Sequence, residues 1–256
     1  MQPAIQVRGL SCGWGERLIL RELDFDIQAG EVVTILGGSG CGKSTLLKHL
    51  IGLYPPLAGS ILIQGNELVG ADNQAREQIL RMIGVMYQSG ALFGSLSILD
   101  NIKLPLGSFS PLDTAAIDTL ARLKLRLVGL EEFADFYPAE LSGGMQKRAA
   151  IARAMALDPQ ILFLDEPSAG LDPVTSAELD QLIRRLAETQ GVTIVVVTHE
   201  LASIAAIADR AIMLDKSIQG ILAIDTPAAL AAASDPRVAH FFHAARPARA
   251  GTASVL

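Results

Sequence analysis

The feature that most constrains the fold is the segment Gly37–Ser44, which reads GGSGCGKS and matches the pattern G-x-x-x-x-G-K-[ST] without departure. The run before it, Glu31–Leu36, is short, apolar and rich in β-formers, as expected of a buried strand. Apolar residues after it recur at helical spacing, at Leu46, Leu47, Leu50 and Ile51. A strand, a glycine-rich loop and a helix in this order predict a phosphate-binding loop.

The chemistry of such a loop follows from its backbone. Glycines let successive N–H groups turn inward around phosphate oxygens, and the helix N-terminus adds partial positive charge. We expect Lys43 to reach the β- and γ-phosphates of ATP and Ser44 to ligate Mg²⁺. A chance glycine-rich turn is disfavoured by the strand and helix on either side. The predicted nucleotide contacts here are Gly37, Gly38, Ser39, Gly40, Cys41, Gly42, Lys43, Ser44 and Thr45.

Two carboxylates follow a second buried run. Asp165 and Glu166 come directly after the apolar residues 161–164. A carboxylate at the carboxyl edge of a parallel strand beside a phosphate loop is placed to hold Mg²⁺. We assign Asp165 to the metal through water, and Glu166 to polarising the attacking water. A helix cap or solvated turn is the alternative, but two acids beside core residues are costly without a task.

The rest of the chain alternates strand and helix patterns. Residues 23–27 alternate apolar and acidic, which predicts a half-buried strand, and Thr193–Val197 is a β-branched run typical of a sheet buried on both faces. Between the buried runs, Asp172-Pro173 predicts a helix N-cap, and one helix face is marked by Leu179, Leu182, Ile183 and Leu186. We therefore predict an α/β fold, a P-loop NTPase core with a largely parallel sheet.

Residues from about 90 to 158 have a different pattern. A Ser/Pro-rich turn is expected after Pro105, at residues 107–111, and helices are expected after it. Their apolar face is predicted at Leu120, Leu123, Leu127 and Leu130. We interpret this region as an α-helical subdomain inserted between core strands. After about Ile224 the chain becomes alanine-rich, and we expect a tail that is mobile or ordered by a partner.

Composition limits the function classes. The 256 residues carry a net charge of −6, which argues against nucleic acid as the main partner. Mean hydropathy is +0.37, yet the longest uncharged stretches, 82–99 and 50–66, contain polar residues, glycines or prolines and are not expected to span a membrane. No signal peptide is expected at the N-terminus. The two cysteines form no metal or disulfide pattern, so the cytosol is the expected compartment.

A further motif separates the classes of phosphate-loop protein. Leu141–Met145 (LSGGM) opens a helical run and precedes Asp165. With this motif in place, the chain resembles the ABC ATPase family from about residue 5 to residue 225. The resemblance implies an antiparallel β region in the N-terminal part, an ATPase domain over residues 1–225, and a C-terminal extension over 226–256.

The resemblance also assigns roles by position. Trp14 stands where the family stacks an aromatic on adenine; Gln88 matches the glutamine that contacts Mg²⁺ and links the site to the helical subdomain. The signature residues Ser142, Gly143 and Gly144 contact ATP bound to the other protomer. Asp172 belongs to the loop that crosses the dimer interface. His199 matches the histidine on the γ-phosphate, and it follows the 193–197 run directly.

The implied mechanism needs two copies of the chain. Each ATP lies between the phosphate loop of one protomer and the signature of the other, so binding closes the homodimer and hydrolysis reopens it. The chain departs from many members at Met145, where they have Gln; here Gln146 follows. The phosphate contact through Ser142 and the backbone is expected to survive this change.

Four segments resemble one subfamily, the Mla-type ATPases of phospholipid transporters that work with MCE proteins. They are residues 37–49, Gln88–Phe93 (QSGALF), Leu141–Arg148 (LSGGMQKR) and 235–242 (DPRVAHFF). The resemblance implies a multipass permease, an MCE-domain protein and, as a further candidate, a small STAS-domain partner, with the chain peripheral on the cytoplasmic side of the inner membrane. The apolar residues after Gln88 suit a groove for a permease helix, and Phe241-Phe242 suits an anchor into the partner protomer, although ordinary packing within the domain could explain both.

Two other functions remain open from the sequence. A small-solute importer, for example for amino acids, would use the same catalytic residues with another permease. A soluble ABC ATPase of DNA repair or translation would usually carry two ATPase domains or a long coiled coil, and this sequence has one motif set and no long heptad pattern.

Overall fold

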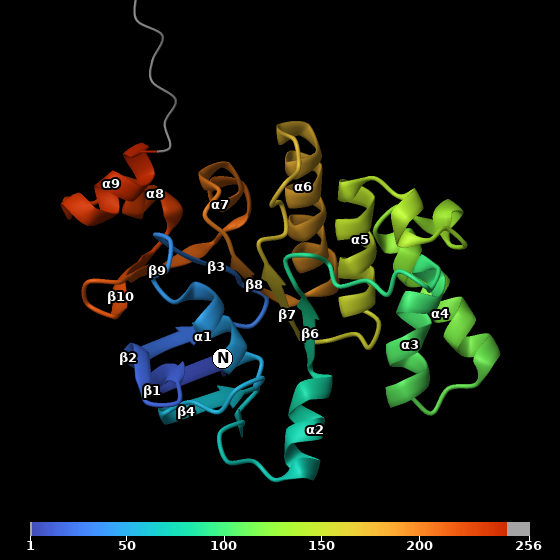
Figure 1. The fold of residues 1–256 in the computed structure, drawn as a ribbon, viewed down its shortest axis with the longest axis horizontal. Helices are drawn as coiled ribbons and strands as arrows, with labels where there is room; N and C mark the ends of the chain where they lie inside the picture. Colours follow the sequence, from blue (N-terminus) through green and yellow to red (C-terminus); the bar gives the residue numbers. More distant parts are fainter. Residues whose placement is uncertain (1, 245–256) are drawn as a thin grey trace, which may run out of the picture.

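The computed structural model describes residues 2–244 and contains two sheets (Figure 1). The first sheet is antiparallel and has the strand order β2-β1-β4-β5. Alternate side chains of its strands are buried, as the pattern at residues 23–27 predicts. Its strands are β1 (Ile5–Trp14), β2 (Arg17–Ile27), β4 (Ala58–Ile63) and β5 (Asn66–Glu67).

The second sheet has the order β10-β9-β3-β8-β7-β6, and only β10 pairs antiparallel to its neighbour. Its central strands are buried on both faces because helices or the first sheet cover each side. The predicted largely parallel α/β core with an N-terminal antiparallel region is confirmed. The strands are β3 (Val32–Gly37), β6 (Ile83–Met86), β7 (Ile161–Asp165), β8 (Thr193–Val197), β9 (Arg210–Asp215) and β10 (Gly220–Asp225).

The two faces of this sheet enter separate cores. Alternate residues such as Phe163 and Val195 pack with α1 (Lys43–Leu50) and the antiparallel sheet. Their neighbours Leu162 and Ile194 pack with α6 (Pro173–Gln190) and the helical subdomain. Helix α2 (Asn73–Arg81) adds Ile79 to the first of these cores, and α7 (Leu201–Ile207) adds Ile207 to the second. The helix faces predicted for α1 and α6 are the buried ones.

The helical subdomain lies between β6 and β7 in the chain and projects to one side of the sheet (Figure 1). Its elements are α3 (Ile98–Phe109), α4 (Thr114–Leu127), the short 3-10 helices η1 (Glu131–Phe133) and η2 (Pro138–Glu140), and α5 (Gly143–Ala154). Because α5 leads back into β7, the subdomain is connected directly to the strand that ends in the two carboxylates.

Two details of the sequence interpretation were wrong here. Helix α3 continues through Pro105 to Phe109, and Ser110 ends it by bonding the Leu106 carbonyl. On α4 the buried positions are Ala121, Lys124 and Leu125. Of the four predicted positions, Leu130 is buried and Leu120 packs against the core, whereas Leu123 and Leu127 are 37% and 36% exposed. Leucine spacing alone misplaced Leu123 and Leu127 because the leucines of α4 occur on more than one side of the helix, and contact with α3 and α5 selects the buried face.

The chain after β10 is folded as far as the structure describes it. It forms α8 (Pro227–Ala231) and α9 (Pro236–Ala244), so the expectation of a mobile tail is wrong for residues 226–244. Phe241 and Phe242 pack with Leu36 and Met213 of the same chain. Residues 245–256 lie outside the described residues. Among residues 2–244, no helix has both the length and the apolar character that crossing a membrane requires.

The corrected face of α4 is testable with a matched pair of variants. Leu125→Ala should lower the free energy of unfolding by about 2–5 kcal/mol, since it opens a cavity. Leu123→Ala, on the exposed side, should change it by less than about 1 kcal/mol. Urea denaturation of both variants measures the difference. Equal losses in the free energy of unfolding would show that Leu123 is as important to the core as Leu125 and would contradict the buried face described above.

Candidate functional site

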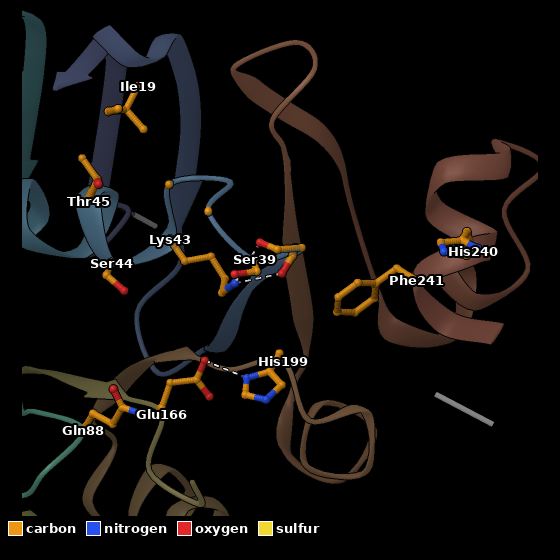
Figure 2. A pocket seen from close by; sticks show the side chains of 14 residues that line it. Ile19, Ser39, Lys43, Ser44, Thr45, Gln88, Glu166, His199, His240 and Phe241 are labelled. Carbon is orange, nitrogen blue, oxygen red and sulfur yellow. Dashed lines mark hydrogen bonds and ion pairs between the residues drawn. The ribbon is translucent and has the colours of Figure 1, made fainter. Parts of the chain in front are cut away.

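The phosphate loop joins β3 to α1 and borders a cavity of about 860 Å³. Gly37 has φ 145°, and a Cβ there would lie 2.4 Å from the Leu214 carbonyl oxygen, so only glycine fits. Lys43 Nζ donates to the carbonyls of Gly37 at 2.8 Å and Gly38 at 3.3 Å. The lysine thus lies folded over its own loop, beside Ser39 and Ser44 (Figure 2).

The carboxylate pair stands at the carboxyl end of β7. Asp165 is partly buried, and its Oδ1 has no partner among the protein atoms. Burial, and then the nearby Glu166, raise the pKa of the Asp165 carboxyl. Such an orphaned oxygen in a polar corner fits a metal ion or its water.

Glu166 follows in a left-handed backbone conformation, with φ 46°. This conformation is uncommon for a residue with a side chain and is found at functional sites. The Glu166 N–H continues the sheet ladder by donating to the Val197 carbonyl at 2.8 Å. The Glu166 side chain is 13% exposed. Its Oε2 is buried without a hydrogen-bond partner, so this oxygen is free to accept a hydrogen bond.

His199 comes from the end of β8, the neighbouring strand. Its Nδ1 lies 2.9 Å from Glu166 Oε1, and Figure 2 shows the pair facing the cavity. A carboxylate oxygen accepts, so Nδ1 is the nitrogen that donates. The sequence indicated separate roles for Glu166 and His199 and did not predict this hydrogen bond between them.

Gln88 follows β6 and lines the same cavity. It also lines a neighbouring hollow with Asp165, so it connects the two carboxylate positions. Its backbone is held by α5: Lys147 Nζ donates to the Gln88 carbonyl, and Arg153 donates to the carbonyls of Gly90 at 2.9 Å and Ala91 at 2.7 Å. These cations were not predicted, and only the repeated Lys/Arg on the predicted helix could have suggested them.

The structure does not bring every predicted residue into one cavity. Trp14 ends β1, packs against Tyr54, and is absent from the cavity lining. Ser142 is exposed and caps α5, its Oγ accepting from the Met145 N–H at 3.3 Å. Asp172 caps α6 as predicted, its Oδ1 accepting from the N–H groups of Val174 and Thr175.

One glycine of the signature, Gly144, is required by packing. A Cβ on Gly144 would lie 2.4 Å from Thr175 of α6, so a side chain there would push α5 away. Gly143 and Ser142 are exposed and do not line the cavity of their own chain. Their exposed helix N-terminus is therefore available to a ligand held elsewhere.

The donor set suits Mg²⁺ better than a softer metal. Ser44 and Gln88 line the cavity and offer a hydroxyl and an amide oxygen, and Asp165 offers the orphaned carboxylate oxygen. Oxygen ligands shared with phosphates are what Mg²⁺ uses. Among the described residues there is no cluster of three or more His, Cys, Asp or Glu that could hold a metal by itself.

Two lining residues were missed as site residues. His240 and Phe241 of α9 border the cavity on the side opposite Thr45 (Figure 2). The sequence interpretation noted Phe241 only as an anchor for a partner. Nothing in the local pattern could have placed α9 beside the phosphate loop, because that contact depends on how β9 and β10 return the chain.

Comparisons with known proteins agree with this geometry. The ABC transporter family profile matches residues 20–169. The chain is 44% identical, over 84% of its length, to "Probable ribonucleotide transport ATP-binding protein mkl" of Mycobacterium leprae, of which it spans 62%. It is 37% identical to "Intermembrane phospholipid transport system ATP-binding protein MlaF" of Haemophilus influenzae, covering 94% of this chain and 90% of that one.

A solved structure is similar as well. The dimeric post-hydrolysis state of the ATP-binding cassette MJ0796, bound to ADP and Pi, superimposes with a TM-score of 0.78 at 32% identity. The match covers 87% of this chain and 98% of that chain.

The raised pKa of Asp165 predicts a stability effect. The ordinary pKa of this carboxyl is 3.8. A carboxyl whose pKa rises on folding destabilises the folded state once the pH exceeds this ordinary value. Asp165→Asn removes this cost, so without nucleotide and with EDTA it should unfold at a higher temperature than wild type at pH 7. The difference in unfolding temperature between Asp165→Asn and wild type should narrow as the pH falls toward 4.

Asp24→Asn, at an exposed carboxyl on β2, is the matched control and should show no such pH-dependent gain. Thermal unfolding by circular dichroism at several pH values measures both. A destabilised Asp165→Asn at pH 7 would mean that the carboxylate is stabilised by contacts other than those described.

Proposed function

This chain belongs to the ABC transporter family, and we propose that it is the ATP-hydrolysing subunit of a transporter that moves phospholipids between the inner and outer membranes. The observation that carries the ATPase assignment is the convergence of Lys43, Ser44, Gln88, Glu166 and His199 on one cavity. The phospholipid assignment is supported by the relative from Haemophilus influenzae, which matches over nearly the whole of both chains.

We propose these roles for the chain's own residues. Lys43 and the loop amides of residues 37–45 bind the phosphates, and Trp14 stacks on adenine. Glu166 accepts a proton from the attacking water through the oxygen that His199 leaves free. The water oxygen bonds to the γ-phosphorus, the bond to the β–γ bridging oxygen breaks, and ADP and phosphate leave. Mg²⁺, held by Ser44, Gln88 and Asp165, supplies charge stabilisation at the phosphates.

The signature serves the second protomer in this proposal. Ser142, Gly143 and Gly144 of one chain complete the site of its partner, and Asp172 lies in the loop that crosses between them. ABC ATPases dimerise and pair with membrane permeases; the permease here is proposed to contact the apolar residues after Gln88, among which Phe93 is 50% exposed. An MCE-domain protein and a STAS-domain protein are proposed as further subunits.

The proposed location and domain limits follow from the same assignment. The chain would be peripheral on the cytoplasmic side of the inner membrane, held there by its permease. Residues 1–225 would form the ATPase domain, with the helical subdomain at about 90–158. Residues 226–256 would form a C-terminal extension that contacts the partner protomer, in addition to the packing of α9 on its own domain.

Glu166→Gln should lower the ATPase rate by about 10²–10⁴-fold while ATP binding remains, because the amide cannot accept the proton. Phosphate release measures the rate, and equilibrium dialysis with ATP measures binding. Glu188→Gln, an exposed glutamate on α6, is the control and should hydrolyse ATP normally. Near-normal hydrolysis by Glu166→Gln would refute its role.

The shared site predicts complementation between two inactive variants. Lys43→Ala and Ser142→Arg should each abolish hydrolysis alone. When the unfolded subunits are mixed and refolded in equal amounts, about a quarter of the sites should recover, since half of the dimers are mixed and each has one intact site. The double variant Lys43→Ala/Ser142→Arg refolded with an equal amount of wild type is the control: its mixed dimers have no intact site, so the mixture should show about half the activity of the wild type it contains, with no recovery. Absence of recovery in the first mixture would argue against a shared site.

The cargo is tested by what purifies with the chain. Tagged in its native host and extracted in mild detergent, it should bring down a multipass permease, an MCE-domain protein and phospholipid, identified by mass spectrometry. A permease with a solute-binding protein and no MCE partner would move the chain to the small-solute importers. The catalytic assignments would stay unchanged.

A further inference from the structure

His49 is a buried histidine near the C-terminal end of α1, and both of its ring nitrogens are engaged. Its side chain is fully buried. Nε2 lies 3.3 Å from the Gly13 backbone nitrogen, and Nδ1 lies 3.0 Å from the Tyr54 carbonyl oxygen. The imidazole therefore bridges two backbone segments that are far apart in the chain.

The two partners fix the protonation of the ring. A carbonyl oxygen only accepts, so Nδ1 must carry the proton; a backbone N–H only donates, so Nε2 must be bare. The ring is thus neutral. Burial lowers the pKa of the His49 imidazole, which agrees with a neutral ring.

Both bridged segments lead to the same indole. Gly13 directly precedes Trp14. The Tyr54 ring packs on Trp14 edge to face, with centroids 4.4 Å apart and an interplanar angle of 78°. The neighbouring Lys48 places Nζ 5.3 Å from the centroid of the same ring. Trp14 remains 36% exposed, so part of its ring is open to a ligand.

Helix α1 connects the phosphate loop, at its start, to His49, near its end. Helix α1 begins at Lys43 with the phosphate loop and has eight residues, so it is about 12 Å long. Its first turn lines the cavity of the proposed phosphate site, and its last turn carries His49. A rotation of Trp14 would thus change the spacing between the phosphate site and the aromatic ring.

We propose that His49 is a positioning residue that, together with Tyr54, holds Trp14 as the platform for the nucleotide base. This inference rests on the proposed function, because it takes the bound molecule to be ATP. His49 itself touches no nucleotide. It keeps the Gly13 amide and the Tyr54 ring in place, so the indole is ordered before the base arrives and less entropy is lost on binding.

The test compares two probes, ATP and inorganic tripolyphosphate, which share phosphates and differ in the base. In His49→Leu we expect ATP binding to weaken about tenfold, within the range of base–aromatic stacking. Tripolyphosphate binding should stay within about twofold. In ATPase assays the KM for ATP should rise similarly with little change in kcat, since the base contact is the same in ground and transition states.

Trp14 is the only tryptophan in the chain, so its fluorescence reports the platform directly. Without nucleotide, the emission of His49→Leu should move to longer wavelength as the ring becomes more exposed. The amide of Gln reaches the position of Nε2 and that of Asn reaches Nδ1. His49→Gln should therefore keep the Gly13 bond and most of the ATP affinity, and His49→Asn should lose them.

Two controls keep the outcome decisive. Leu50→Ala removes another buried side chain from α1 and should lower stability without changing the ratio of the two affinities. Tyr54→Leu alters a partly exposed ring, so it should fold even if a His49 variant does not, and it should weaken ATP selectively.

Each outcome has a distinct meaning. Equal weakening of ATP and tripolyphosphate binding in His49→Leu would make His49 a purely structural residue of α1. Unchanged ATP affinity would show that His49 has no role in binding ATP. Either result overturns the inference. A wild-type chain that binds both probes equally would show that Trp14 is no platform, which also overturns it. A wild-type chain that binds neither probe would instead refute the proposed function.

Discussion

The parallel pairing of β3, β7 and β8 is the constraint on which the rest of the structure depends. The register pairs Ile35 with Val197 and Asp165 with Val197, so the three strands end at one edge of the sheet. The phosphate loop, the carboxylate pair and His199 leave the sheet at that edge. The ladder continues one residue further through the Glu166 N–H, which holds a left-handed glutamate in place. Buried strands cannot slip in register without exposing core residues, so the geometry of the site is fixed by the core.

Helix α5 connects the site to the helical subdomain in two ways. Its N-terminus presents Ser142 on the surface, and its interior donates from Lys147 and Arg153 to the backbone carbonyls after β6. On the far side of the same loop, the buried Asn101 of α3 bonds the backbone of Phe93 in both directions. The segment that carries Gln88 must therefore move when α5 or α3 moves. A permease that contacts this segment would act on the signature helix and on Gln88 together.

The C-terminal helices show how tertiary contacts change the meaning of a sequence pattern. Phe241 and Phe242 were interpreted as an anchor into another protomer, because two aromatic residues in an alanine-rich segment suit a docking site. In the structure both rings pack on β3 and β9 of their own chain, and Phe241 also borders the nucleotide cavity. Two adjacent apolar residues predict that they will be buried, but the fold decides which surface covers them. Both contacts remain compatible within a dimer, since the rings are only partly buried.

The sequence by itself determined the phosphate loop, the buried strands, the α6 cap at Asp172 and the order of the site motifs. These are local properties: glycine conformations, runs of core residues and capping side chains act over a few positions. Only the tertiary structure decided which face of α4 is buried, that Glu166 and His199 share a hydrogen bond, that Lys147 and Arg153 hold the segment after Gln88, and that His49 reaches Gly13 and Tyr54. Each of these depends on the distance between segments remote in sequence, and hydrophobic periodicity carries no information about that distance.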